Sequence, residues 1–216
     1  MNAELILKTE AFLKQTFAAS NHLQASPTER DYRLEHSYRV ANIAKAIAEA
    51  EGFDVSNAVI AALLHDIAYC EEMVTREDRI NHGRRSAAIA RPFLESLGLP
   101  DETVNEICYG IAIHVDDKAD FEWKRTPFCE TVGDADNIDR FDVYRIYESL
   151  QYIQFSKMPL AEKQKHVNGT IDRLTQYKEM PLGTETAKKL WIECLNYYIS
   201  FYEKLSTQLE NSTNIM

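Results

Sequence analysis

Four histidines and a cluster of aspartates stand where the sequence predicts inward-facing side chains. Neutral imidazoles and carboxylates, without thiolates, suit a divalent ion of intermediate hardness such as Fe, Mn, Co, Ni or Zn. Such a set of ligands holds either one ion with an open face, or two ions about 3.5–4 Å apart bridged by a carboxylate. The candidate residues are His36, His65, Asp66, His82, His114, Asp134, Asp136 and Asp139.

The central stretch, from Ala58 to Tyr69, reads AVIAALLHDIAY. The residues before His65 are all apolar, and Ser56 is a candidate N-cap, so we expect a helix buried on nearly every face. His65 and Asp66 then enter the interior together. A buried carboxylate is costly unless it is paired, hydrogen-bonded or bound to a metal ion. If two ions bind, Asp66, with two oxygens on the central helix, is the natural bridge between them.

The remaining apolar segments show helical spacing, and none alternates as a strand does. We predict an all-α chain with eight or nine helices in one domain, residues 1–216. A capping-box pattern at Ser26 and Glu29 is expected to open a short turn before the second helix. The last residues, NSTNIM, are expected to fray. The predicted helices span about 3–19, 31–51, 58–69, 82–97, 101–114, 128–141, 143–155, 160–177 and 184–209.

Composition narrows the classes of function. The net charge of −10 argues against a general nucleic-acid surface. No run of apolar residues is long enough to span a membrane, and the first residues lack the layout of a signal peptide, so we expect a cytoplasmic protein. The four cysteines form no CxxC pattern and are expected to be free thiols in a reducing compartment.

The order His36, His65-Asp66, Asp136 resembles the HD-domain superfamily of metal-dependent phosphohydrolases. The first helix of that superfamily is similar to LEHSYRVANIAKAIA here, its central signature to AALLHDIA, and its final segment to DADNIDR. The resemblance covers about residues 30–145, and the helices of residues 156–210 are expected to pack on that region. One departure is Tyr69, where the nucleotidase-like branch often has Glu.

The resemblance implies that His36, His65, Asp66 and Asp136 bind a metal ion. Asp136 is preferred to Asp134 as the last ligand because the ligand usually follows Ala. Asp134 is then expected to orient a histidine from outside the ligand set. The alternative for the whole set is a hydrogen-bonded structural network.

The segments around His82 and His114 are similar to subfamilies with the fuller pattern H…HD…H…H…D, which bind two metals. The resemblance therefore adds His82 and His114 as metal ligands. The alternatives are that His82 is simply a histidine at a helix start beside a loop, and that His114 is a cation stabilising a helix C-terminus. The other two histidines, His22 and His166, have polar neighbours and are expected at the surface.

Phosphate recognition needs donors near the metal ligands. Arg39 lies one helical turn beyond His36 and is the preferred candidate. Four further cations lie near ligand segments, with a solvated or ion-paired surface role as the alternative for each. They are Arg84, Arg85, Lys118 and Arg140.

The sequence thus predicts a hydrolase that uses metal-activated water to cleave a phosphomonoester or phosphodiester, nucleotides included. Asp66 and Arg39 are the predicted catalytic residues, and the predicted cofactor is one or two divalent ions (Fe, Mn, Ni, Co, Zn or Mg). One alternative is a di-iron oxygenase on the same ligands. Another is a non-catalytic ligand-binding module whose C-terminal Trp and Tyr helices form an interface, as in a homodimer.

Overall fold

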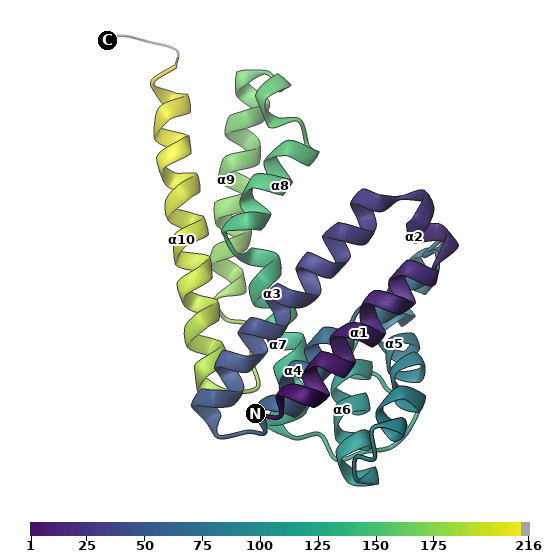
Figure 1. Ribbon diagram of the computed structural model, residues 1–216. Helices are drawn as coiled ribbons and strands as arrows, with labels where there is room; N and C mark the ends of the chain where they lie inside the picture. The colour runs from purple at the N-terminus through teal and green to yellow at the C-terminus, as the bar shows by residue number, and fades with distance from the viewer. Residues whose placement is uncertain (213–216) are drawn as a thin grey trace. The chain divides into compact units, whose positions relative to one another are not determined.

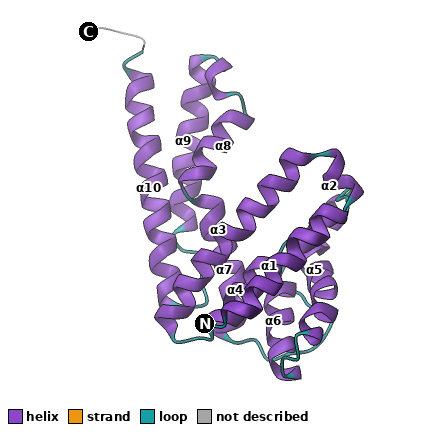
Figure 2. Ribbon diagram, in the orientation of Figure 1, coloured by secondary structure: helices purple, strands orange, loops and turns teal. Residues whose placement is uncertain are grey.

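The computed structural model describes residues 1–212 of the 216. Within that range the elements are ten α-helices and two short 3₁₀ helices joined by loops, with no strand (Figure 2). The all-α prediction is therefore confirmed. Residues 213–216 of the predicted frayed end lie outside the described residues. No described helix combines the length and the apolar character needed to cross a membrane.

The chain divides into two compact units, residues 1–136 and 137–216. A further helix, α7 (Pro127–Phe141), begins in the first unit, and its last residues belong to the second. The prediction of one domain, with the C-terminal helices packed on residues 30–145, stays a prediction. The other elements of the first unit are α1 (Ala3–Ala19), α2 (Asn21–Ala25), α3 (Pro27–Glu51), α4 (Val55–Leu64), η1 (Ile67–Cys70), α5 (Arg76–Ser96) and α6 (Asp101–Ile113) (Figure 1).

The short helix α4 forms the core of the first unit. Eight of its ten residues are buried, and it packs against α1, α3 and α6. Its alanines leave room for neighbouring backbones to approach closely, because each presents only a methyl group. Helices α5 and α6 pack along one another beside it. The unit therefore surrounds one apolar helix with the elements that contain the candidate ligands.

The central helix is shorter than predicted. It begins after Asp54, whose side chain accepts the Asn57 N–H at 2.9 Å, so Asp54 and not Ser56 is the N-cap. It ends at Leu64, and a separate 3₁₀ turn follows Asp66. Ser56 instead accepts a hydrogen bond from the backbone N–H of Asn2 at 2.6 Å, a contact that joins the start of α1 to α4.

Two other predicted helix starts are wrong. Helix α5 begins at Arg76 and not at His82, because Thr75 and Asp78 form a reciprocal capping box. Helix α3 begins at Pro27 and runs without a separate turn to Glu51, and the Ser26 side chain makes no capping hydrogen bond. The predicted end of this helix is confirmed at Gly52, which adopts a left-handed conformation at φ 73°.

The second unit contains α8 (Val143–Tyr152), η2 (Phe155–Lys157), α9 (Leu160–Tyr177) and α10 (Glu185–Glu210), with α9 and α10 side by side (Figure 1). Trp191 of α10 is fully buried. Its indole N–H donates to the carbonyl oxygen of Tyr177 at 2.9 Å, and the Phe141 ring packs edge-on at 4.9 Å between centroids. The large apolar side chains of α10 thus form a core, as the spacing predicts.

Candidate metal centre

The two signature residues lie where the central helix breaks. His65 still has helical backbone angles, whereas Asp66 departs from them at φ −105° and ψ 14°. The two residues are 0% and 4% exposed. The break turns both side chains into one polar cluster, in which His65 Nε2 lies 3.7 Å from Asp66 Oδ1.

The first ligand group consists of His36, His65, Asp66 and Asp136. Helix α3 supplies His36, whose Nε2 lies 3.2 Å from His65 Nε2 and 3.7 Å from Asp66 Oδ2. Helix α7 supplies Asp136, whose Oδ1 lies 3.2 Å from His36 Nε2 and 4.0 Å from His65 Nε2. All four residues are buried. One ligand atom each from His36, His65 and Asp66 falls within 4.8 Å of the others.

The second ligand group consists of Asp66, His82 and His114. Asp66 Oδ1 lies 2.9 Å from His82 Nε2 and 3.7 Å from His114 Nε2, and the two Nε2 atoms are 3.1 Å apart. Asp66 therefore turns Oδ2 toward His36 and Oδ1 toward the second group. One carboxylate thus lies between two sets of imidazoles, which is the arrangement of a bridging ligand.

Close packing of α5 on α6 brings His82 and His114 together. Gly83 follows His82, and a Cβ atom at Gly83 would lie 2.7 Å from the carbonyl oxygen of Ala112 and 3.1 Å from His114 Nδ1. No side chain fits there without movement of the α6 backbone. Gly83 therefore permits the separation of 3.1 Å between the two imidazole nitrogens.

Backbone carbonyl groups fix the tautomers of three histidines. The Nδ1 atoms of His65, His82 and His114 lie 2.7, 2.6 and 2.7 Å from the carbonyl oxygens of Ala62, Arg79 and Ile111. A carbonyl oxygen only accepts, so each Nδ1 must donate its proton there. Each neutral imidazole then presents an unprotonated Nε2 to the cluster. This arrangement, with Nδ1–H on a backbone carbonyl and Nε2 on the ion, is usual for metal-bound histidine.

The charges of the cluster follow from burial and proximity. Burial lowers the pKa of His65 to about 4, an effect that the imidazoles of His114 and His36 increase. Burial by itself raises the pKa of Asp66, but the neighbouring imidazoles hold it well below its ordinary value. Burial by itself lowers the pKa of His82, yet the Asp66 carboxylate raises it above its ordinary value. At neutral pH the cluster thus offers an ionised carboxylate and a neutral His65.

Sequence reasoning missed Arg33, which reaches the cluster from α3. Its Nη1 lies 3.3 Å from Asp66 Oδ2, and its guanidinium carbon lies 3.3 Å from the centroid of the Tyr69 ring. Its Nε is buried without a hydrogen-bond partner among the described residues. The spacing held a signal, because Arg33 precedes His36 by one helical turn and thus shares its face.

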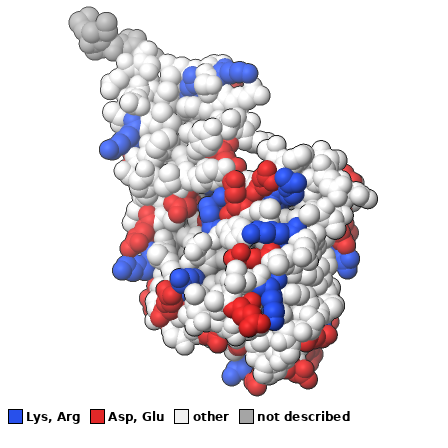
Figure 3. All heavy atoms as spheres, in the orientation of Figure 1, with Lys and Arg blue, Asp and Glu red and all other residues white. Residues whose placement is uncertain are grey.

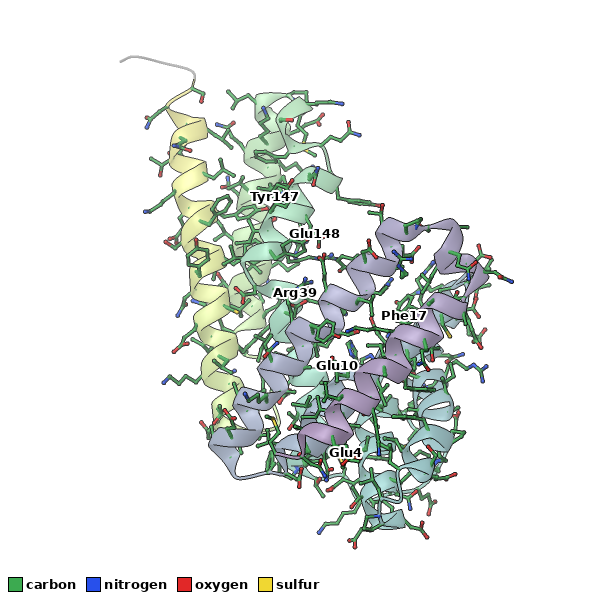
Figure 4. The ribbon with its side chains drawn as sticks, in the orientation of Figure 1. Glu4, Glu10, Phe17, Arg39, Tyr147 and Glu148 are labelled. Atoms are coloured by element: carbon green, nitrogen blue, oxygen red, sulfur yellow. The ribbon has the colours of Figure 1, made fainter. Side chains whose placement is uncertain are left out.

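Most of the cations proposed from sequence are engaged elsewhere or exposed. Arg84 pairs with Asp116, with Nη1 and Oδ1 2.7 Å apart, and Arg85 pairs with Glu71, with Nε and Oε2 2.8 Å apart. Lys118 and Arg140 are exposed. Arg39 is half-buried on α3 (Figure 4), and its predicted role in phosphate binding stays a prediction. Asp134 is buried on α7.

Comparison with known proteins identifies the fold and the family. The crystal structure of a predicted HD superfamily hydrolase from an uncultured Thermotogales bacterium is similar, with a TM-score of 0.63 and 22% sequence identity over 93% of this chain and 90% of that one. That likeness shows a shared fold. No curated protein matches the chain. Residues 33–144, more than half of the chain, match the family described as HD domain. The chain belongs to the HD domain family.

Proposed function

We propose that this chain is a metal-dependent phosphohydrolase whose two ligand groups hold two divalent ions, with Asp66 between them. The observation that supports this most directly is the pair His82 and His114. Both imidazoles use Nδ1–H on a carbonyl oxygen, so their neutral forms direct two lone pairs at each other across 3.1 Å. A cation must lie against both: a proton in the metal-free protein, or a metal ion.

The ligand residues fit a divalent ion in their chemistry. Imidazole nitrogen and carboxylate oxygen, without thiolate, suit ions from Mn to Zn. A divalent ion in such a site lowers the pKa of bound water to about 7 and offsets negative charge on a phosphoryl group. The low pKa of Asp66 keeps its carboxylate charged, and the low pKa of His65 keeps its Nε2 free of a proton. Both residues are thus in the state that metal binding requires.

Arg33 is the residue we assign to the substrate phosphate. It presents a planar set of donors, of which Nε has no hydrogen-bond partner among the described residues. Its side chain is 19% exposed, so a substrate at the cluster can reach it without entering the core. The Tyr69 ring lies against the guanidinium and holds its plane fixed. Nη1 lies 3.3 Å from Asp66 Oδ2 and Nη2 lies 3.8 Å from Glu29 Oε1, so a substrate phosphate would share these donors with the two carboxylates. An arginine so placed suits an anion with several oxygens, such as a phosphate ester.

Metal content and a phosphoesterase screen together test the proposal. We expect elemental analysis to find close to two divalent ions per chain in the purified protein. We also expect the protein to hydrolyse at least one phosphomonoester or phosphodiester in the absence of molecular oxygen. Removal of the metal with a chelator should abolish turnover, and adding Mn²⁺ or Co²⁺ should restore it. Turnover that survives complete metal removal would overturn the proposal.

The role of Arg33 has its own test. Arg33→Gln keeps a polar side chain but removes the charge, so we expect KM for the phosphate ester to rise by about tenfold or more. Lys8→Gln removes an exposed cation from the same unit and serves as the matched control, with KM unchanged. Equal effects of the two substitutions would exclude a specific role for Arg33. A strict requirement for iron and oxygen would instead identify the oxygenase alternative.

A further inference from the structure

A cavity of about 650 Å³ lies in the second unit, lined by residues of α8, by Ile153 that follows it, and by α9. An adjoining cavity of about 380 Å³ shares His166 and Arg173 with it. Neither is lined by a residue of the candidate metal centre. The larger volume falls within the roughly 300–1,000 Å³ that small-molecule sites occupy. The proposed phosphohydrolase activity leaves this space without a role.

Two arginines line the larger cavity, and Arg173 is the one available to bind an anion. Within the part of the chain that the structure describes, it makes no ion pair, and its hydrogen bond runs from Nη2 to Thr170 Oγ1 at 3.4 Å. It lies seven residues after His166, so both side chains share one face of α9. His166 Nε2 lies 3.4 Å from the Tyr202 hydroxyl. Burial, and then the charge of Arg173, lower the pKa of His166, so this imidazole adds polarity without adding charge.

The other charged groups around the two cavities come close to cancelling. Arg145 pairs with Glu148 of the same helix, with 3.2 Å between Nη1 and Oε2 (Figure 4 labels Glu148). Lys165 and Glu162 both line the adjoining cavity. The guanidinium of Arg173 thus remains as the net positive charge of this site.

The acidity of the protein lies elsewhere in the chain. Residues 1–136 contain 14 Lys and Arg against 24 Asp and Glu, and residues 137–216 contain ten of each. All of the net charge of −10 therefore belongs to the first unit. On the face that Figure 3 draws, acidic and basic side chains alternate over α1 and α3, whereas the end of the second unit where α8 leads into α9 shows basic side chains. An anion therefore meets less repulsion near the second unit than the net charge of the whole protein would suggest.

The rest of the cavity wall suits a flat group. Tyr152 lines it at the end of α8 and is 88% exposed, so its ring has a face available for stacking. Ile153 adds apolar surface beside it. In the adjoining cavity, a Cβ atom at Gly169 would meet nothing within 4 Å, so packing does not explain a glycine in the middle of α9. The adjoining cavity is thus open beside Gly169, one helical turn before Arg173.

We propose that the cavity between α8 and α9 binds a small organic phosphate that contains a flat ring, with the phosphate at Arg173 and the ring against Tyr152. A guanidinium that makes no ion pair matches a phosphate, and an exposed phenol ring matches a planar ring. The site is distinct from the candidate metal centre and requires no metal ion.

Calorimetric titration of AMP into the full-length protein tests this proposal. The same titration is carried out with the Asp66→Asn variant, in which the candidate metal centre is disabled. We expect AMP to bind both proteins with similar affinity. Loss of AMP binding in Asp66→Asn would place the ligand at the metal centre and overturn the second site. Absence of AMP binding to either protein would overturn it as well. AMP binding at this cavity is expected whether or not the protein proves to be a phosphohydrolase.

Substitutions within the cavity locate the ligand. Arg173→Ala should weaken AMP binding by about tenfold or more, because it removes a charged hydrogen-bond donor. Lys204→Ala removes an exposed cation from α10 and should leave AMP binding unchanged; equal weakening by both would show diffuse attraction only. Arg173 is itself exposed, so an unchanged melting temperature is expected and verifies folding.

The two ends of the ligand can be tested apart. Inorganic phosphate and adenosine should each bind more weakly than AMP, and Tyr152→Ser should weaken AMP while leaving inorganic phosphate unaffected. Inorganic phosphate that binds as tightly as AMP would exclude a contribution from the ring. Adenosine that binds as tightly as AMP would exclude a role for Arg173.

Discussion

The two ligand groups share Asp66 but differ in how the protein surrounds them. In the first group, the side chains of His36 and His65 are 5% and 0% exposed, and burial lowers the pKa of His65 to about 4. In the second, the side chain of His82 is 12% exposed, and Asp66 raises its pKa. The contrast thus lies between His65, which is fully buried and neutral, and His82, which is partly exposed and more readily protonated, whereas the side chain of His114 in the second group is only 1% exposed.

This difference suggests a division of roles between the groups. Neutral, buried ligands bind a metal ion without first releasing a proton, and they exchange it slowly with solvent. A ligand set that must lose a proton binds more weakly and responds to pH. We therefore expect the first group to hold the more firmly bound ion and the second group to hold the exchangeable one.

The largest effect is expected at the residue that the groups share. Asp66→Asn removes a negative charge and leaves an amide between two sets of imidazoles, so both groups should lose affinity. We expect metal content near zero after dialysis, and a loss of turnover greater than the about 10–100-fold that removal of a group outside the ligand set costs. Asp120→Asn removes a carboxylate whose side chain is 79% exposed and is the matched control. Full metal content in Asp66→Asn would contradict the bridging role.

Single histidine substitutions should separate the groups. His65→Ala affects the first group, and His82→Ala affects the second. We expect His82→Ala to retain about one ion per chain through dialysis. His65→Ala should lose the firmly bound ion and retain little metal. His22→Ala, a histidine outside both groups, should leave the content unchanged, as elemental analysis will show. Equal residual metal content in His65→Ala and His82→Ala would show that the two groups do not differ in how firmly they bind metal.

A third prediction concerns the helix contact behind the second group. Gly83→Ala places a Cβ atom 2.7 Å from the Ala112 carbonyl oxygen, so α5 and α6 must move apart. We expect unfolding free energy to fall by about 1–3 kcal/mol, and the second ion to be lost before the first. Gly169→Ala is the control: its Cβ meets nothing within 4 Å and should stabilise α9 by about 0.5–1 kcal/mol. Denaturant unfolding curves measure both changes.

The comparison of the two groups also explains what the sequence could predict. The signature around His36, His65 and Asp66 indicates one buried polar cluster, because an apolar run leading into a charged pair has few other solutions. Its distances depend on a helix break after Leu64 that the apolar pattern conceals. Ala, Leu and Ile continue on both sides of the break, so helical periodicity alone extends the helix too far.

Other features depend on tertiary contacts that no local pattern contains. Thr75 and Asp78 have the residue types and spacing of a capping box, but the polar residues that follow show no apolar stripe, so the predicted helix begins only at residue 82. The approach of α5 to α6 requires knowing that Gly83 faces a carbonyl of another helix. His166, expected at the surface, is half-buried beside a cavity, because Tyr202 from a helix distant in sequence packs near it.

The mildest test of the two groups is acidification of the metal-loaded protein. A proton competes with the ion for Nε2, so binding weakens by roughly tenfold for each pH unit below the pKa of the histidine. The pKa of His82 is raised above its ordinary value, whereas that of His65 is about 4. The second group should therefore release its ion first, and the release should begin already above about pH 6.5, the ordinary pKa of histidine, because the pKa of His82 is raised.

The pKa of Asp66 lies well below its ordinary value, so its carboxylate stays ionised across this window and cannot be the group that titrates. Metal content after equilibrium dialysis at pH 7.5, 6.5 and 5.5 should thus fall from about two ions per chain toward one, with the remaining ion retained. His82→Ala should show no such step, since the histidine that gains the proton is gone. Simultaneous release of both ions would mean that the groups bind metal as one unit, and the contrast in their burial would then have no functional consequence.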